Sequence, residues 1–345
     1  MHRLALLTVL VALLAACPPA AAAVAAEAAP AQPAVQPAAR QAAAAPADAA
    51  ATIEKTSTPG MAGTTVEEFK VPSPEMKRDI EVVVVLPPAY AREAGKRFPV
   101  LYTLHGRGAS FRVFKDMTTV HKAIAQQPMI VVGFNADRAS WYLDATKKND
   151  SRFTTFFFKT LVPAVDKLYR TRADAPGRAV TGFSMGGFGA FHLMLAKPDA
   201  FASASGMSGA FEPLGVGWLK KDFVELLGTP EENARGYAQV RLGDRIKAAA
   251  KKRVKLPPVY IACGTEDALL PQSQAMRDLA KKLGLKVEYV EAPGAHKFTY
   301  WKAAATGVID FHWRTFQPDY KPVDHSQPAD EPKTGEQQSG QKKTE

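Results

Sequence analysis

The chain has 345 residues, 46% of them hydrophobic, which is enough apolar material for one large core. Its formal net charge is +10, and part of that charge comes from a basic cluster within residues 247–255. No aromatic residues interleave with this cluster, so we interpret it as a solvated helix face and expect no nucleic-acid partner.

The first 17 residues are typical of a secretory signal. A positively charged start precedes an apolar run at residues 4–14, which is too short to span a bilayer permanently. The run ends in Leu-Ala-Ala-Cys at Cys17, which resembles the lipobox of bacterial lipoproteins, where the cysteine is lipidated. The alternative is an ordinary signal cut in the Ala-rich stretch that follows. We therefore expect an exported protein, periplasmic or at the cell surface, attached to a membrane through Cys17; Cys263 then has no disulfide partner.

Two segments lack the material for a core. Residues 18–61 are almost entirely Ala, Pro and small polar types, and we expect them to form a disordered tether. Residues 318–345 form a polar tail, which we also expect to be disordered. The composition thus predicts a single folded domain over residues 62–317.

Short β-branched runs alternate with helical patterns through this domain. We expect strands at residues 81–86, 99–104, 129–134, 178–181, 259–263 and 286–290. Apolar helix faces at 158–169 and 275–283 lie between strands. This alternation predicts an α/β fold with a mostly parallel, twisted sheet covered by helices on both faces. An early pair of strands is expected at residues 65–71 and 78–86, and the turn-rich link at 72–74 that joins them indicates an antiparallel start to the sheet.

Residues 211–256 interrupt the alternation. They carry Gly and Pro near the start, are followed directly by Pro257 and Pro258, and contain helical patches at 219–227 and 241–250. One interpretation is a small helical cap over the crevice at the carboxyl ends of the strands. A peripheral helical connection explains the pattern equally well, and both stay open.

A Gly-x-Ser-x-Gly motif at residues 182–186 places Ser184 between the strand at 178–181 and an apolar helix at 187–196. Strand, sharp turn and helix are the context of a nucleophile elbow, in which flanking glycines leave the serine hydroxyl exposed. The alternative is a buried structural serine in a Gly-rich turn. Context favours Ser184 as a nucleophile.

A serine nucleophile needs a base and an acid to orient that base. Asp267 follows the strand at 259–263, and His296 follows the strand at 286–290, so both lie at carboxyl ends of strands. The order Ser, Asp, His is that of α/β-hydrolases. We assign His296 as general base and Asp267 as its orienting acid; Glu266 is the rival acid.

The other histidines have simpler interpretations. His192 lies within the helix that follows the serine and is interpreted as a hydrogen-bonded core residue. For His121, His312 and His325 we expect solvent contact or core filling.

Acyl transfer also requires donors for the developing oxyanion, usually backbone N–H groups. The N–H of Met185 follows the serine directly. A second donor is expected in the loop after the strand at 99–104, where the sequence reads His-Gly-Arg-Gly. We assign the N–H of Arg107, with that of Gly106 as the alternative, and interpret His105 as a structural residue of the loop.

Four stretches together resemble the esterase D superfamily of α/β-hydrolases: residues 104–106, 182–189, 263–267, and 294–296 with Tyr300 and Trp301. This superfamily includes S-formylglutathione hydrolases, tributyrin and feruloyl esterases and mycolyltransferases. The resemblance covers residues 65–316 and implies an α/β-hydrolase fold, a Ser184, His296 and Asp267 triad and the two oxyanion donors. It does not specify the substrate.

Substrate contacts are less well defined by the sequence. Trp141 and Tyr142 resemble the superfamily's substrate-facing loop, although core aromatic packing explains them equally well. Gly106 is expected to border the substrate beside the serine. Lys297 departs from the superfamily pattern, in which a small polar residue often follows the histidine, so the surroundings of the acyl or leaving group are in doubt.

We expect neither a metal nor a cofactor, because the chain has no His-Glu-x-x-His motif, Cys/His cluster or Gly-x-Gly-x-x-Gly after a strand. The sequence predicts a serine esterase acting on a small-molecule or polysaccharide ester. Two alternatives remain: acyl transfer to a sugar or lipid acceptor, and a catalytically inactive binding module on the same fold. The oligomeric state cannot be read from the sequence.

Overall fold

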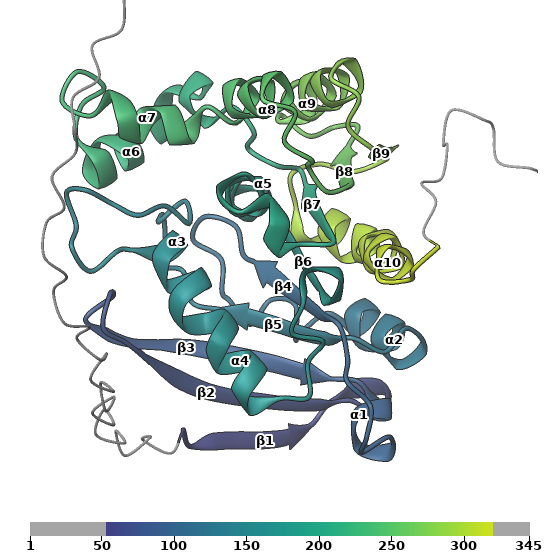
Figure 1. Ribbon diagram of the computed structural model, residues 1–345. Coiled ribbons are helices and arrows are strands. Elements are labelled where there is room, and N and C mark those ends of the chain that lie inside the picture. Colours follow the sequence, from purple (N-terminus) through teal and green to yellow (C-terminus); the bar gives the residue numbers. More distant parts are fainter. Residues whose placement is uncertain (1–52, 320–345) are drawn as a thin grey trace, which may run out of the picture. The chain divides into compact units, whose positions relative to one another are not determined.

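The computed structural model describes residues 53–319, a sheet flanked by helices (Figure 1). The predicted signal peptide, Cys17, most of the predicted tether and nearly all of the polar tail, including His325, lie outside the described residues. Within residues 53–319, no helix has both the length and the apolar character that a membrane span requires.

The strands of the described region form one sheet with the order β1-β2-β3-β5-β4-β6-β7-β8-β9. Their bounds are β1 Lys55–Pro59, β2 Thr65–Ser73, β3 Arg78–Leu86, β4 Val100–Leu104, β5 Ile130–Phe134, β6 Arg178–Phe183, β7 Ser203–Met207, β8 Val259–Gly264 and β9 Val287–Ala292. The pairs β1–β2, β2–β3 and β3–β5 are antiparallel. The pairs β5–β4, β4–β6, β6–β7, β7–β8 and β8–β9 are parallel. The mostly parallel sheet with an antiparallel start is therefore confirmed.

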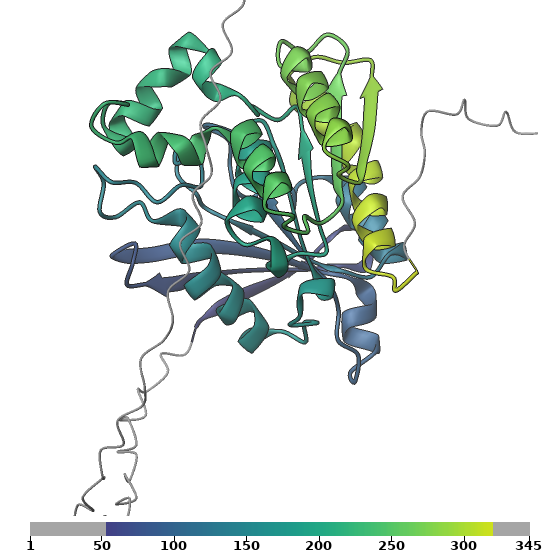
Figure 2. The same cartoon turned by 45° about the horizontal axis from the view of Figure 1, so that its top comes forward.

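Helices cover both faces of this sheet (Figures 1 and 2). Their bounds are α1 Pro88–Arg92, α2 Thr118–Gln126, α3 Phe153–Phe156, α4 Val162–Leu168, α5 Met185–Ala196, α6 Lys220–Leu227, α7 Ala234–Val240, α8 Leu242–Lys251, α9 Leu270–Lys282 and α10 Phe298–Thr315. A π-helical turn, Phe157–Leu161, joins α3 to α4. Helices α2 and α10 contribute to one core cluster, whereas α3, α4, α5, α8 and α9 contribute to the other.

Strand β3 shows why both faces are covered. Its run of four valines has no polar alternation, and the side chains of a strand point to opposite faces in turn. Val82 and Val84 are therefore buried in the cluster with α3 to α5, and Val83 and Val85 in the cluster with α2 and α10.

The folded unit begins earlier than the sequence predicted. Residues 55–59, expected to belong to the tether, form edge strand β1 and pair antiparallel with β2. All five residues of β1 are exposed, so this strand contributes backbone hydrogen bonds and little apolar burial. Lys55 also forms an ion pair with Glu67, with 2.9 Å between Nζ and Oε2. Apolar patterning does not reveal such a strand.

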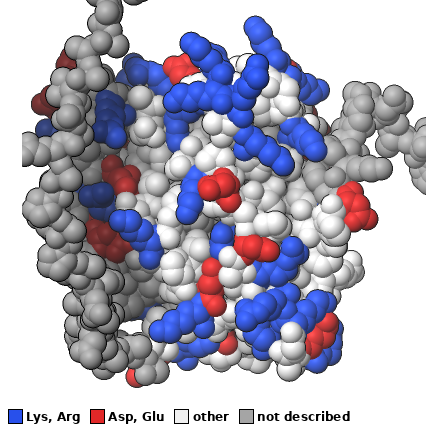
Figure 3. All heavy atoms as spheres, viewed as in Figure 1, with Lys and Arg blue, Asp and Glu red and all other residues white. Residues whose placement is uncertain are grey.

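The interrupting segment, residues 211–256, folds into helices that pack against two different parts of the domain. Helix α8 buries Leu242 and Ile246 and packs against α5, as a sheet-covering helix does. The basic residues between 247 and 255, which lie in the second half of α8 and in the turn after it, are exposed, and Lys and Arg side chains are prominent on this face of the molecule (Figure 3). Helix α6 instead contacts the loop after β5, where the N–H groups of Thr146 and Lys147 donate to the carbonyl of Leu226.

Candidate active site

Ser184 lies at a sharp turn between β6, which ends at Phe183, and α5, which begins at Met185. Its backbone has φ 55° and ψ −119°, a left-handed conformation that a non-glycine residue adopts only at a cost. Strain of this kind is characteristic of functional turns. The turn leaves Ser184 partly exposed, whereas its neighbours on both sides are buried.

The two motif glycines are required by close backbone contacts. A Cβ at Gly182 would lie 2.4 Å from the carbonyl oxygen of Gly186, and a Cβ at Gly186 would lie 2.0 Å from the carbonyl oxygen of Leu104. The start of α5 therefore touches the end of β4. This contact places the serine beside the loop that follows β4.

His296 and Asp267 complete a hydrogen-bonded chain with the serine, as their positions in the sequence predicted. His296 Nε2 lies 3.0 Å from Ser184 Oγ, and His296 Nδ1 lies 2.9 Å from Asp267 Oδ2 and 3.0 Å from Oδ1. The two residues come from the loops after β8 and β9, which end side by side in the sheet. An ionised carboxylate only accepts hydrogen bonds, so it holds the proton on Nδ1 and leaves Nε2 free to accept from Ser184.

The environment of Asp267 keeps it ionised. Its side chain is fully buried, and burial alone would raise the pKa of this carboxyl. Hydrogen bonds from His296, from the N–H of Leu269 and from Ser208 outweigh burial, so the pKa of Asp267 is lowered. Glu266, the rival acid, is exposed and makes no side-chain hydrogen bond or ion pair within the described region.

Trp301 and Ser208 support this chain, and neither was assigned a role from the sequence. The Trp301 ring packs edge-on against His296 at 5.0 Å between centroids and stacks on Phe183 at 4.2 Å. Its Nε1 donates to Ser208 Oγ at 3.1 Å, and Ser208 in turn contacts Asp267. The signal for Trp301 was present, because this residue lies in one of the four stretches that resemble the superfamily.

The predicted oxyanion donors belong to two segments that border Ser184: Met185 follows it directly, and Arg107 follows Gly106 in the loop after β4. Within residues 53–319, neither the N–H of Met185 nor that of Arg107 donates to another backbone carbonyl. Gly106 borders the serine, since a Cβ there would lie 3.3 Å from Ser184 Cβ. The same Cβ would lie 2.6 Å from the Phe183 ring, so this position requires glycine.

His105 orients the peptide that carries the Arg107 N–H. The N–H of Ala136 donates to His105 Nε2 at 3.1 Å, so the imidazole proton lies on Nδ1, which donates to the Gly106 carbonyl at 2.9 Å. In a trans peptide the C=O and N–H point in opposite directions, so fixing the Gly106 carbonyl also fixes the direction of the Arg107 N–H. Burial lowers the pKa of His105, which keeps the ring neutral and this tautomer in place.

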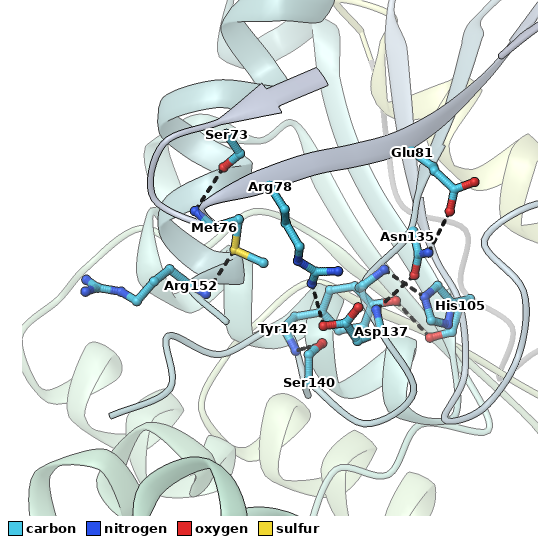
Figure 4. A network of polar contacts seen from close by, with 11 residues as sticks. Ser73, Met76, Arg78, Glu81, His105, Asn135, Asp137, Ser140, Tyr142 and Arg152 are labelled. Carbon is cyan, nitrogen blue, oxygen red and sulfur yellow. Dashed lines mark hydrogen bonds and ion pairs between the residues drawn. The ribbon is translucent and has the colours of Figure 1, made fainter. Parts of the chain in front are cut away.

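The expectation that Trp141 and Tyr142 face the substrate is corrected by the structure. Both side chains are buried, at 1% and 0% exposure. Trp141 packs edge-on against Phe188, and the Tyr142 hydroxyl donates to the His105 carbonyl at 2.9 Å (Figure 4). Core packing, the alternative considered for this pair, describes them correctly. Tyr142 thus helps to hold the loop after β4.

The remaining described histidines are buried and hydrogen-bonded, so none is available as a base. His121 contacts Thr64, His192 contacts Thr154, and His312 contacts Ser203 and Ser205. This agrees with the structural roles expected for them.

Comparison with known proteins gives the family. The Esterase family model matches residues 73–309, more than half of the chain. The chain belongs to the Esterase family. This match, together with the relatives below, confirms the resemblance to the esterase D superfamily and the α/β-hydrolase fold.

Two curated relatives and two solved structures illustrate the similarity. An esterase of Mycobacterium tuberculosis is 32% identical over 240 residues, which are 63% of this chain and 52% of that protein, so the chain spans about half the length of this relative. The S-formylglutathione hydrolase of Bos taurus is 27% identical over 230 residues, 61% of this chain and 78% of that protein. A ferulic acid esterase structure has a TM-score of 0.62 at 23% identity, over 74% of this chain and 99% of that chain. The S-formylglutathione hydrolase structure from Agrobacterium tumefaciens has a TM-score of 0.64 at 17% identity, over 77% and 99%.

Proposed function

We propose that this protein is a serine esterase that hydrolyses carboxylic esters through an acyl-enzyme. The observation that carries the proposal is the continuous hydrogen-bonded chain from Ser184 through His296 to Asp267, with 3.0 Å and 2.9 Å between the bonded atoms. Nucleophile, base and orienting acid at these distances are the geometry that acyl transfer requires.

In the first half of the reaction, His296 Nε2 takes the Ser184 proton as Oγ attacks the carbonyl carbon of the ester. The carbonyl oxygen becomes negative and accepts hydrogen bonds from the N–H groups of Met185 and Arg107. Asp267 stabilises the imidazolium. The C–O bond to the leaving alcohol then breaks, and the alcohol takes the proton from Nε2.

In the second half, His296 takes a proton from water, whose oxygen attacks the acyl carbon. The same two N–H groups receive the negative oxygen, the bond to Ser184 Oγ breaks, and Oγ recovers the proton from Nε2. Ser184 and His296 are both partly exposed, so an ester and water reach them from solvent.

The names of similar proteins, which include an S-formylglutathione hydrolase and ferulic acid esterases, support a proposal for the substrate class. We propose a small-molecule or polysaccharide ester as substrate. Chromatography of the products from a panel of acetyl, butyryl and feruloyl esters defines the acyl preference, and adding a sugar acceptor distinguishes transfer from hydrolysis.

We also propose that the protein is exported and attached to a membrane through lipidated Cys17. The support is the Leu-Ala-Ala-Cys end of the apolar N-terminal run. The Cys17→Ser variant is then expected in the soluble fraction, and the wild type with the membranes. An unmodified N-terminus at an alanine beyond residue 20, found by mass spectrometry, contradicts this proposal.

The experiment for the esterase proposal is labelling with a fluorophosphonate, which reacts with activated serines. We expect one labelled peptide containing Ser184, and we expect His296→Ala to abolish the labelling because Oγ loses its base. Labelling at another serine, or none in a folded protein, contradicts the proposal.

A further inference from the structure

The side chain of Arg107 forms a buried ion pair with Asp222 of helix α6. Arg107 Nε lies 2.6 Å from Asp222 Oδ2, and Nη2 lies 2.8 Å from Oδ1. The side chains are 17% and 3% exposed. Two parallel, charge-assisted hydrogen bonds fix the direction of a guanidinium as well as its distance. The pair therefore holds Arg107 in one orientation relative to α6.

Asp222 connects three segments that are far apart in the sequence. Besides Arg107, it accepts a hydrogen bond from Trp141 Nε1 at 3.1 Å, in the loop after β5. The Trp141 ring also packs against Phe223 of α6 and Phe188 of α5, the helix that begins directly after Ser184. A single carboxylate thus links the loop after β4, the loop after β5 and α6.

In the tripeptide Gly106-Arg107-Gly108, only Arg107 has a side chain that can connect the turn to another segment. Gly106 and Gly108 flank it, and Gly108 has a positive φ of 71°. Glycine leaves the backbone conformationally free, so this turn is mobile unless something else restrains it. Three restraints act on this turn: His105 and Ala109 hold the Gly106 carbonyl, the N–H of Gly108 donates to the Arg138 carbonyl at 2.8 Å, and Asp222 holds the side chain of Arg107.

We propose that Asp222 is a positioning residue of the reaction, which acts together with His105 to hold Arg107 so that its backbone N–H points at the oxyanion. This inference rests on the proposed esterase function. Interactions with an oxyanion lose strength steeply when a donor moves, and displacement by about 1 Å costs on the order of 10²-fold in rate. Helix α6 thereby acts on the chemical step through a residue that does not touch the substrate.

The alternative is that the ion pair only stabilises the fold. The chain offers a matched control for this, the pair between Arg314 of α10 and Glu288 of β9. It is also bidentate, at 2.9 Å for both hydrogen bonds, and the Glu288 side chain is 1% exposed. Glu288 lies near the start of β9, whereas His296 follows the end of that strand. Loss of either buried pair is expected to lower stability by a similar amount.

The experiment compares Asp222→Asn and Arg107→Met with the control Glu288→Gln. Arg107→Met keeps the backbone N–H and removes only the restraint. We expect both site variants to lower kcat on a short-chain nitrophenyl ester by about 10- to 100-fold, with KM changed less than threefold. Combining them is expected to cost no more than the worse single change, because both remove the same interaction. Glu288→Gln is expected to keep kcat within twofold of wild type at a similar loss in melting temperature.

A double variant covers the case in which a single change unfolds the protein. Arg107→Met with Asp222→Leu removes both charges, which is often neutral for stability, and is still expected to lose kcat. Folded site variants that keep kcat within twofold of wild type overturn the inference. Ser184→Ala in the same assay separates the two proposals. If activity survives it, the esterase mechanism fails; if activity is lost with Ser184 but not with Asp222, only the role of Asp222 fails.

Discussion

Gly186 at the start of α5 lies against the carbonyl group of Leu104 at the end of β4. A Cβ at Gly186 would lie 2.0 Å from the Leu104 oxygen and 2.6 Å from its carbonyl carbon. Both are backbone atoms of a buried central strand, so they cannot move aside. The helix that carries the serine and the strand that leads into the oxyanion loop are therefore in backbone contact.

Gly186→Ala is expected to destabilise the protein and to reduce ester hydrolysis. Forcing an extra carbon into a packed backbone contact costs about 1–3 kcal/mol or more, and any relief separates Ser184 from the loop after β4. The measurement is melting temperature together with kcat/KM. The control is Gly95→Ala, because a Cβ at Gly95 meets no atom within 4 Å. If Gly186→Ala and Gly95→Ala had the same melting temperature and the same kcat/KM, the contact between Gly186 and Leu104 would not be tight.

Asp267→Asn is expected to lower kcat/KM by at least several hundred-fold. The same change in a serine protease lowers kcat by about 10⁴-fold, which we take as the upper limit. An amide NH₂ in place of one carboxylate oxygen allows the imidazole to take the wrong tautomer. Glu266→Gln is expected to stay within about threefold of wild type, because Glu266 is exposed. A larger loss for Glu266→Gln than for Asp267→Asn would reassign the acid.

Stability is expected to fall as the pH is lowered from 7.5 to 5.0. Burial lowers the pKa of His312 from 6.5 to about 3, although nearby Glu288 acts in the opposite direction. The unfolded chain takes up this proton as the pH falls below about 6.5, whereas the folded chain does not, so unfolding is favoured. At about 1.4 kcal/mol per pH unit, the loss at pH 5.0 amounts to about 2 kcal/mol from this residue.

The check on this prediction is urea denaturation of the wild type and His312→Gln at both pH values. Burial also lowers the pKa of His105 and His192, so part of the pH dependence is expected to remain in the variant. The variant is expected to lose less stability between pH 7.5 and 5.0, whatever its absolute stability. An identical loss in both proteins would contradict the assignment of a neutral, buried His312.

Most of the sheet was predictable because its strands carry β-branched runs. Two strands were not predicted, for different reasons. Strand β1 is exposed along its whole length and has no apolar pattern. Strand β7, Ser203–Met207, consists mainly of small residues and lacks β-branched side chains, although it is fully buried between β6 and β8. Gly206 packs against Gly187 of α5, where a Cβ would lie 3.4 Å from the Gly187 Cα, and Ser203 and Ser205 hydrogen-bond to His312. These constraints appear only once the chain is folded.

The proposed triad was predictable because each member follows a strand, and carboxyl ends of parallel strands converge. The partner of Arg107 was not. Asp222 lies 115 residues further along the chain, on a segment whose position over the sheet the sequence left open. For Trp141 and Tyr142, aromatic character alone does not distinguish a substrate surface from a core.

The most direct test of the central claim is kcat/KM of Ser184→Ala on a short-chain nitrophenyl ester, with circular dichroism showing that the variant is folded. Ser184 is partly exposed, so removing its hydroxyl leaves almost no cavity and the fold is expected to persist. The account predicts a loss of at least about 10³-fold, because no other residue forms the acyl-enzyme. A folded Ser184→Ala variant that retains more than a tenth of wild-type activity would contradict it.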